Sequence, residues 1–204
     1  MIARLFKTIA QLLGRLRAAP HVARYILAIV VLGRQRAFSG ASERLAKIPG
    51  QWGVYTRQAF YRWTLDHLGR DVYFGFMSLL SKPDIRIGDS VYIGRFCTIG
   101  LADLGDAVML ADNVSILSGR HQHGRSAVGA DAGQTLQDNE QTYTRVMIAS
   151  GAWIGASAVV MANVGRGAIV GAGAVVVKPV EANSTVAGVP AKTLNASPPT
   201  TRAA

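Results

Sequence analysis

Residues 87–116, IGDSVYIGRFCTIGLADLGDAVMLADNVSI, decide the fold of this chain. Aliphatic residues recur in this stretch every six positions, and the residue after each is usually glycine or alanine. A small or β-branched residue recurs four positions after most of the aliphatic ones, and the pattern resumes at residue 148. The twelve aliphatic anchors are Ile87, Ile93, Ile99, Leu104, Leu110, Ile116, Ile148, Ile154, Val160, Val164, Val170 and Val176.

A six-residue period is not helical, and simple strand alternation does not require the glycines. The pattern predicts an all-β solenoid in which each hexapeptide forms one short strand and one corner. The anchors are then stacked in columns inside, and glycine supplies corner backbone that other residues reach only with strain. Two steps break the period: Ile99 to Leu104 is five residues, and Val160 to Val164 is four. Two ordinary sheets of short, glycine-bounded strands are the alternative.

Composition is consistent with one folded domain plus an appendage. The chain has 204 residues, half of them hydrophobic, and 22 glycines, which suits a folded repeat protein better than a disordered one. Its single cysteine, Cys97, excludes an internal disulfide. Cys97 occupies a small inward position of the repeat, so we expect buried packing rather than a reactive thiolate.

Charge is concentrated at the N-terminal end. Residues 1–70 hold twelve Lys or Arg against Glu43 and Asp66, a net charge of +10, whereas residues 71–204 balance to zero. The basic segment therefore needs its own explanation. The charge is diffuse and no recognised module accompanies it, so we expect no nucleic-acid partner.

The N-terminal segment should be helical. The apolar spacing predicts an amphipathic helix over residues 1–17, in a segment that Pro20 closes. A similar spacing predicts a second helix over residues 51–69, which Gly69 ends. The apolar residues of the first are Ile2, Leu5, Phe6, Ile9, Leu12, Leu13 and Leu16. The apolar run 25–32 is too short to span a bilayer, and no clear signal-peptide cleavage site follows it. Residues 72–80 should form an irregular first rung.

Two interpretations of this segment stay open. It can cap the open first coil of the solenoid with its apolar faces. It can also contact a membrane peripherally through residues 1–35, with Arg and Lys near anionic lipid. We divide the chain into a basic helical segment (1–70), a solenoid domain (71–188) and a C-terminal tail (189–204).

The interruption at residues 119–145 is the chemical centre of the sequence. It reads GRHQHGRSAVGADAGQTLQDNEQTYTR, polar and nearly free of aliphatic residues. An insertion this long is usually functional or disordered. His121 and His123 stand at its start, and a histidine on a loop held by a rigid scaffold can act as a general base. The His-x-His spacing also suits a metal pair, with a third ligand from Asp131, Asp138 or Glu140.

Four motifs carry a family resemblance: SILSGRHQHG (115–124), GAWIG (151–155), VGAGAVVVK (170–178) and VAGVPAK (186–192). Residues 72–194 resemble the hexapeptide-repeat acyltransferases, most of all the O-acetyltransferases of bacterial exopolysaccharide and lipopolysaccharide biosynthesis. The resemblance implies a left-handed parallel β-helix and a homotrimer with active sites between subunits. It also implies acetyl-CoA as the acyl donor.

The resemblance also assigns residues. His121 best matches the family's loop histidine, and His123 is the second candidate. The expected coenzyme A contacts are Trp153, Gly155, Gly171, Ala172, Lys178 and Lys192. The chain departs from the family where the coil at 162–166 is two residues short, which affects the coenzyme pocket. It also departs in its longer basic N-terminal helices, which point to a membrane-associated substrate.

The function expected from these residues is direct transfer of an acetyl group from acetyl-CoA to a sugar hydroxyl, with His121 or His123 as general base. No covalent nucleophile and no metal are expected. We expect the protein in the cytoplasm, where the N-terminal segment can contact the inner face of the cytoplasmic membrane. Two alternatives differ in class. A γ-carbonic-anhydrase-like metalloenzyme would need His67 as a third imidazole beside the loop histidines. A non-catalytic trimeric scaffold docked at the membrane would bind no coenzyme A.

Overall fold

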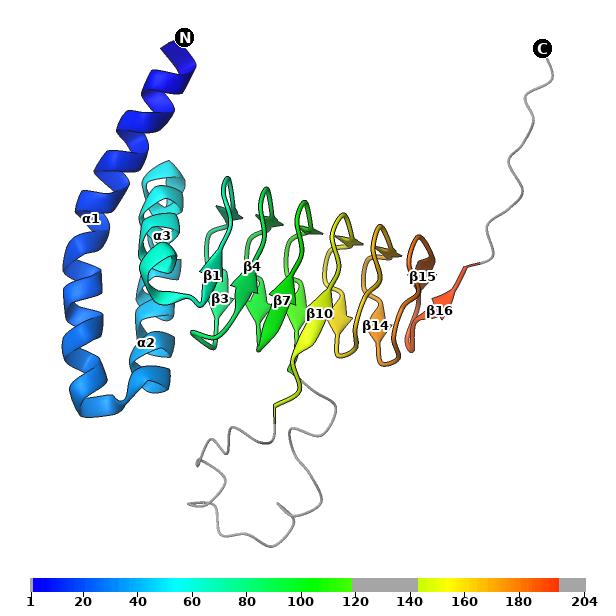
Figure 1. Cartoon of the computed structure of the whole chain (residues 1–204). Coiled ribbons are helices and arrows are strands. Elements are labelled where there is room, and N and C mark those ends of the chain that lie inside the picture. Colours follow the sequence, from blue (N-terminus) through cyan, green and yellow to red (C-terminus); the bar gives the residue numbers. More distant parts are fainter. Residues whose placement is uncertain (1, 119–142, 195–204) are drawn as a thin grey trace, which may run out of the picture.

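The computed structural model describes residues 2–118 and 143–194, with side chains from residue 10 onward, as three helices followed by a β-solenoid (Figure 1). The helices are α1 (Ile2–Leu32), α2 (Arg34–Ala46) and α3 (Gly50–Thr64). The strands are β1 (His67–Leu68), β2 (Tyr73–Phe74), β3 (Leu79–Leu80), β4 (Arg86–Ile87), β5 (Tyr92–Ile93), β6 (Thr98–Ile99), β7 (Ala102–Leu104), β8 (Met109–Leu110), β9 (Ser115–Ile116), β10 (Val146–Ile148), β11 (Trp153–Ile154), β12 (Val159–Val160), β13 (Ile169–Val170), β14 (Val175–Val176), β15 (Thr185–Ala187) and β16 (Lys192–Thr193).

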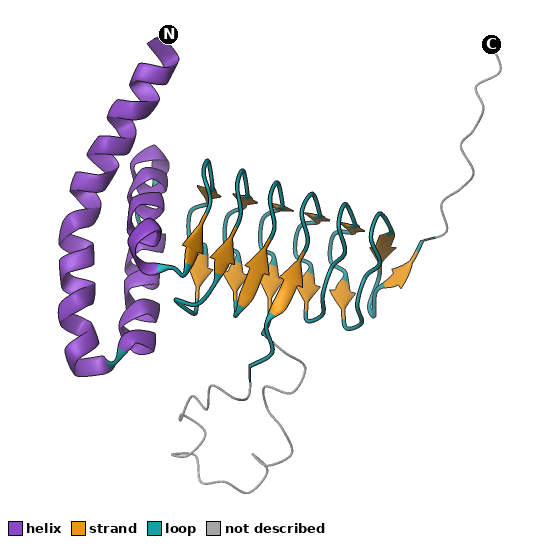
Figure 2. Ribbon diagram, viewed as in Figure 1, coloured by secondary structure: helices purple, strands orange, loops and turns teal. Residues whose placement is uncertain are grey.

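The strands form three sheets, each receiving one strand from successive coils (Figure 2). Sheet A has the order β1-β4-β7-β10, sheet B β16-β15-β13-β11-β8-β5-β2, and sheet C β14-β12-β9-β6-β3. Apart from the antiparallel pair β15–β16, the pairing is parallel. Isolated bridges at Val164 and Val180 extend sheet A. The predicted solenoid is confirmed.

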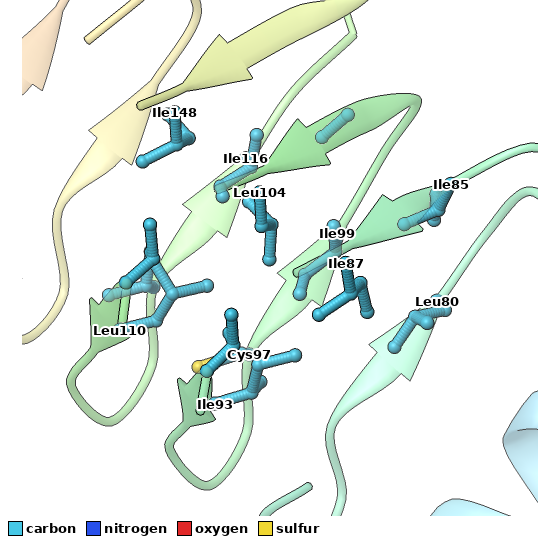
Figure 3. Packing of buried hydrophobic residues seen from close by; sticks show 14 of the residues in the cluster. Leu80, Ile85, Ile87, Ile93, Cys97, Ile99, Leu104, Leu110, Ile116 and Ile148 are labelled. Carbon is cyan, nitrogen blue, oxygen red and sulfur yellow. The ribbon is translucent and has the colours of Figure 1, made fainter. Parts of the chain in front are cut away.

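The anchors pair in the predicted columns. Ile87 pairs with Leu104 in sheet A, whereas Ile99 pairs with Ile116 in sheet C. All twelve anchors are at most 3% exposed, and Figure 3 shows the side chains of the first seven, Ile87 to Ile148, inside the coils. The small residues four positions later, Cys97 among them, form a second buried row. Buried apolar area inside the coils is the main stabilising contribution to the solenoid.

The departures from the six-residue period all fall at one corner. Between sheets A and B and between B and C, successive anchors are six residues apart. Between sheets C and A the distances are seven residues (80 to 87), five (99 to 104), 32 (116 to 148) and twice four (160 to 164 and 176 to 180). The two irregular steps and the insertion therefore share the C–A corner.

The glycines after the anchors have a different role from the predicted one. Their φ angles are not positive; instead, a Cβ on Gly94 would lie 2.6 Å from the carbonyl carbon of Ala111 in the next coil. Glycine is needed there because adjacent coils approach closely. The left-handed conformation falls three positions after the inward residue. It occurs at Asp71, Met77, Ser90, Phe96, Ala107, Asn113, Gly151, Ser157, Gly167, Gly173 and Asn183.

The two kinds of glycine should respond differently to substitution. Gly94→Ala is expected to destabilise the fold by about 2 kcal/mol because the added methyl group overlaps backbone. Gly173 has φ +66° with open space around its Cβ position, so Gly173→Asn should change stability by less than about 0.5 kcal/mol. Urea denaturation of both variants measures the difference. Equal losses would contradict this division.

The helices form two layers at the N-terminal end of the solenoid. Helices α2 and α3 pack against the first coil, and α1 packs on α3 and α2. The predicted helix end at Pro20 is wrong, since α1 continues to Leu32. Pro20 is exposed, and Ala18 and Tyr25 on either side of it are buried, Tyr25 lying edge-to-face on Phe60 with centroids 5.7 Å apart. This packing outweighs the loss of one helical hydrogen bond.

The solenoid begins earlier than predicted. Helix α3 ends at Thr64, where Leu65 becomes extended, and β1 starts at His67 inside the stretch assigned to the helix. Gly69 is therefore the first corner glycine: a Cβ there would lie 2.2 Å from the carbonyl carbon of Gly88. The rung predicted at residues 72–80 is present as β2 and β3.

Cys97 is fully buried, as predicted. Burial raises the pKa of its thiol to about 11. At pH 8 about one thiol in a thousand is then ionised, and no reagent can reach it. We expect negligible labelling of the native protein by a thiol reagent and complete labelling after denaturation. Rapid labelling under native conditions would contradict the packing role.

Candidate active site

The insertion is attached at the C–A corner beside α2. The chain is described up to Ser118, which is 4% exposed, and again from Tyr143, three residues before β10. His121 and His123 lie outside the described residues. The positions of both ends of the insertion are fixed by the coils, so the described surroundings of these ends define where the histidines are attached.

A pocket of about 380 Å³ lies at these ends. Its walls come from α2, from the C–A corners of the first two coils, and from the strand end that leads into the insertion. The lining residues are Gln35, Arg36, Ser39, Ser81, Lys82, Thr98, Gly100, Ile116, Leu117, Ser118 and Tyr143. They include two cations, four aliphatic hydroxyls and no carboxylate.

Lys82 and Gln35 are held in place in this pocket. The Lys82 ammonium lies 3.9 Å from the centre of the Tyr143 ring, a cation–π contact that joins the first coil to the returning end of the insertion. Gln35 Nε2 donates a hydrogen bond to the Ser81 carbonyl at 2.6 Å and fixes α2 against the same corner. The walls can therefore present a positive, hydroxyl-rich surface to a ligand.

Arg145 fixes the returning chain. Its Nη1 donates to the Asp84 carbonyl at 2.8 Å and to Asp103 Oδ1 at 2.5 Å, and both side chains of this ion pair are about 30% exposed. The insertion thus returns to the solenoid at a fixed place. Sequence reasoning missed Lys82, Tyr143 and Arg145, because no motif or spacing connects residues that are far apart in the chain.

Four of the six predicted coenzyme contacts lie close in the repeat. Trp153 points outward from β11 and is 47% exposed, between Met109 and Ile169 in sheet B. Gly155 and Gly171 occupy equivalent corner positions of adjacent coils after sheet B, and Ala172 follows. A Cβ on Gly155 would lie 2.5 Å from the Ala172 nitrogen, so this glycine has a structural role whether or not a ligand is bound.

The two predicted lysines differ in position. Lys178 is exposed on the C–A corner after β14, across sheet C from Gly171. Lys192 is exposed on β16, where it pairs with Ala187. The structure therefore brings together Trp153, Gly155, Gly171 and Ala172. Lys192 lies one strand beyond Ala187, whose Cβ would be 2.9 Å from a Cβ on Gly171, whereas Lys178 lies at another corner.

The outer surface of sheet B carries a row of apolar side chains that sequence reasoning also missed. Tyr73 and Tyr92 are stacked, with ring centroids 4.9 Å apart and planes 4° apart. Met109, Trp153 and Ile169 continue the row, each at least 37% exposed. The signal was present from Tyr92 onward, since Tyr92, Met109, Trp153 and Ile169 each directly precede an anchor.

Metal ligands are not gathered in the part of the chain that the structure describes. Within residues 2–118 and 143–194, no three His, Cys, Asp or Glu side chains lie together in a way that could hold a metal ion. His67 is exposed on β1, in the first coil of sheet A. A three-histidine site would need both insertion histidines as well.

Known structures share this fold. A maltose O-acetyltransferase from Clostridium difficile 630 matches with a TM-score of 0.62 and 22% identity, covering 79% of this chain and 85% of that one. A hexapeptide-repeat-containing acetyltransferase from Vibrio cholerae, in complex with acetyl coenzyme A, matches with a TM-score of 0.61 and 21% identity over 80% and 89% of the two chains. A variant of the Bacillus cereus N-acyltransferase AntD, in complex with dTDP and coenzyme A, gives 0.52 and 19% over 67% and 75%.

At these identities the likeness shows that the chain has the β-solenoid fold of solved hexapeptide-repeat acyltransferases. No protein-family model matches the sequence, and no curated protein matches it significantly.

Proposed function

We propose that this protein is an acetyl-CoA-dependent O-acetyltransferase that acts on a hydroxyl of a sugar or polysaccharide precursor. The observation that carries the proposal is the insertion with His121 and His123, whose ends border a pocket lined by Arg36, Lys82 and four hydroxyls. The shared fold with solved acyltransferases, two of them in complex with acetyl-CoA or coenzyme A, supports it. The scaffold is rigid, and the variation in chain length is confined to one corner.

In the proposed reaction, neutral His121 accepts the proton of the acceptor hydroxyl while that oxygen attacks the thioester carbonyl of acetyl-CoA. The resulting tetrahedral oxyanion is stabilised by backbone N–H groups at a corner. The carbon–sulfur bond then breaks, coenzyme A leaves as thiolate, and the imidazolium returns the proton to sulfur. His123 is the alternative base. The solenoid contributes by holding donor and acceptor in register.

The acceptor class follows from the pocket. Hydroxyl side chains can exchange hydrogen bonds with a polyol, and Arg36 and Lys82 can bind a phosphate or carboxylate attached to it. A phosphorylated or nucleotide-linked sugar of an exopolysaccharide pathway fits this chemistry. The dTDP bound in the AntD variant supports a sugar-nucleotide acceptor.

Coenzyme A is proposed to lie along the C-terminal coils, with Trp153, Gly155, Gly171 and Ala172 near the pantetheine and Lys178 or Lys192 near its phosphates. We further propose a left-handed helix and a homotrimer with sites between subunits. The exposed apolar row on sheet B supports association with another copy, because contact with it would remove apolar surface from water. We place the protein in the cytoplasm.

Acetyl-CoA binding and transfer test the function directly. At a concentration 100 times its Kd, acetyl-CoA should stabilise the protein by about 2.7 kcal/mol and raise Tm by several degrees. Incubation with a panel of sugar phosphates, nucleotide sugars and glycans should add the mass of one acetyl group to one acceptor. If acetyl-CoA produced no shift in Tm and no acceptor were acetylated, the proposed function would be wrong and the non-catalytic scaffold would be the remaining explanation.

Two lysine variants separate the two ligands. Lys178→Met should raise KM for acetyl-CoA, whereas Lys82→Met should raise KM for the acceptor, each about tenfold for the loss of one charged contact. Because Lys82 also contacts Tyr143, the Tm of that variant must be measured alongside. The opposite pattern of KM changes would show that the two binding sites have been assigned to the wrong ligands.

A further inference from the structure

Helix α1 has two faces, and only one is used inside the protein. Gly14, Ala18 and Tyr25 are buried against the other helices, and a Cβ on Gly14 would lie 2.8 Å from the Cβ of Tyr55 in α3. Helices α2 and α3 already cover the first coil. Capping the solenoid therefore does not explain the opposite side of α1.

That opposite side, the outer face of α1, is continuous and apolar. At about 100° per residue its members fall within roughly 140° of the helix circumference. They are exposed: Val30 is 83%, Val31 82% and Leu27 71% accessible. The outer face comprises Leu12, Leu13, Leu16, Ala19, Pro20, Ala23, Ile26, Leu27, Val30 and Val31. An apolar patch of this length is unusual on a soluble surface and marks an interaction site.

Positive charge borders the outer face on both edges. Exposed Arg15 lies along one edge, Arg17 and Arg24 lie along the other, and α1 contains no acidic residue. Arg15 also lines a cleft of about 570 Å³ with Arg62 and other residues of α3. An apolar helix face of leucine and valine with arginine along both edges is typical of helices that lie in the headgroup region of a bilayer.

Tryptophan side chains add to this surface. Trp52 and Trp63 of α3 are 49% and 76% exposed, and the Arg17 guanidinium lies 6.0 Å from the centre of the Trp52 ring. Tryptophan is enriched at the boundary between lipid and water, where its ring is partly apolar and its N–H is hydrated. No helix among the described residues is long and apolar enough to cross a membrane, so the contact would be peripheral.

From the exposed leucines and valines and the flanking arginines, we infer that the outer face of α1 docks on a bilayer rich in anionic lipid. Charge selects this occupant over a second copy of the chain. Self-association through the outer face would bring Arg15, Arg17 and Arg24 of one copy close to those of the other, whereas anionic headgroups complement them. Residues 1–70 contain only two carboxylates to offset twelve cations.

Docking in this way orients the molecule. Helix α1 runs across the N-terminal end of the solenoid, so the solenoid axis would point away from the lipid surface (Figure 1). The 380 Å³ pocket is built from α2 and the first three coils, the part of the solenoid nearest α1. Its acceptor would then be bound close to the membrane, and the C-terminal coils would face the solvent.

Vesicle co-sedimentation of the full chain tests the inference. The protein should sediment with vesicles of phosphatidylcholine and phosphatidylglycerol in equal amounts, and at least about tenfold less with phosphatidylcholine alone. The triple variant Leu27→Gln, Val30→Gln, Val31→Gln should lose at least about tenfold in vesicle affinity. These side chains are exposed and glutamine is a good helix former, so circular dichroism should be unchanged.

Two further variants complete the design. Phe96→Gln with Val189→Gln removes apolar side chains that are also exposed, 52% and 73%, but lie on the solenoid, and this variant should bind vesicles like the wild type. Arg17→Gln with Arg24→Gln should bind more weakly and with less dependence on salt. Undiminished binding of the triple variant would overturn the inference, as would equal binding to both kinds of vesicle. So would concentration-dependent self-association that the triple variant abolishes. Acetyl transfer to a soluble acceptor, measured separately, does not depend on these results.

Discussion

Replacing His121 and His123 together by alanine is expected to lower kcat by about 10²- to 10⁴-fold, the usual contribution of a general base. The fold should be unaffected, because the coils that carry the insertion are held by their own buried anchors and by Arg145. Steady-state kinetics at saturating acetyl-CoA measure the loss. The single variants identify the base: the family resemblance predicts the larger effect for His121→Ala.

A histidine outside the insertion, His67, provides a matched control. His67→Ala removes an exposed imidazole from β1 and should leave kcat within about twofold. In the wild type, kcat/KM should rise with pH through about 6.5, the range in which an ordinary imidazole loses its proton. The double variant should lack this rise. Full activity in the double variant would remove the histidines from the mechanism.

The sequence was sufficient to predict the buried columns of anchors in the solenoid, but not the backbone conformation and packing at its corners. Inward anchors such as Ile93 and Leu110 are apolar in every coil, so burial leaves a periodic signal. The glycine after each anchor was equally periodic, yet its reason was misjudged. Close contact between coils depends on the backbone of a neighbouring coil, as at Gly94 and Ala111, and a single repeat does not contain that information.

The helical end shows the same limit. Pro20 is a correct local signal for a helix end, and tertiary packing of Ala18 and Tyr25 on either side of it overrides that signal. The outer face of α1 was visible in part as an apolar spacing. That it remains uncovered could be known only once α2 and α3 were placed against the first coil.

The candidate site divides along a similar line. The histidines, Trp153 and the corner glycines were identified because they belong to contiguous motifs. The pocket residues Lys82 and Tyr143 were not, because they lie 61 positions apart and meet only through coil stacking. A single sequence does show where the candidate site attaches to the solenoid, because the insertion is the longest of the irregular steps between anchors. The structure adds that every irregular step falls on the same C–A corner, so one corner of the solenoid carries the insertion while the other two stay regular.

The attachment of the helices to the solenoid depends on one buried cation. Arg57 of α3 is 1% exposed, and its guanidinium donates to carbonyls of three elements. The distances are 3.0 Å to Leu45 O, 2.8 Å to Ile48 O and 3.1 Å to Phe74 O. Its Nε has no partner among the described residues, and burial lowers the pKa of Arg57. A single side chain thus satisfies the end of α2, the turn after it and strand β2.

Arg57→Met is therefore expected to destabilise the protein by about 3 kcal/mol or more, because two buried carbonyls and a partly buried one lose their donor at similar side-chain volume. Arg57→Lys should recover less than half of the loss, since one ammonium cannot reach carbonyls of three elements.

Arg62→Met is the matched control. Arg62 also donates to two carbonyls, but its side chain is exposed, so water replaces it at a cost of about 1 kcal/mol. Urea denaturation measures all three in a background in which Trp52 and Trp63 of α3 are replaced by phenylalanine, so that circular dichroism reports the helices and the fluorescence of Trp153 on β11 reports the solenoid. Because two of the lost contacts hold α3 to the end of α2 and the turn after it, and the third joins α3 to β2, the helical signal should fall at lower urea than the solenoid signal. Equal effects of Arg57→Met and Arg62→Met would show that burial of the guanidinium contributes nothing to the attachment.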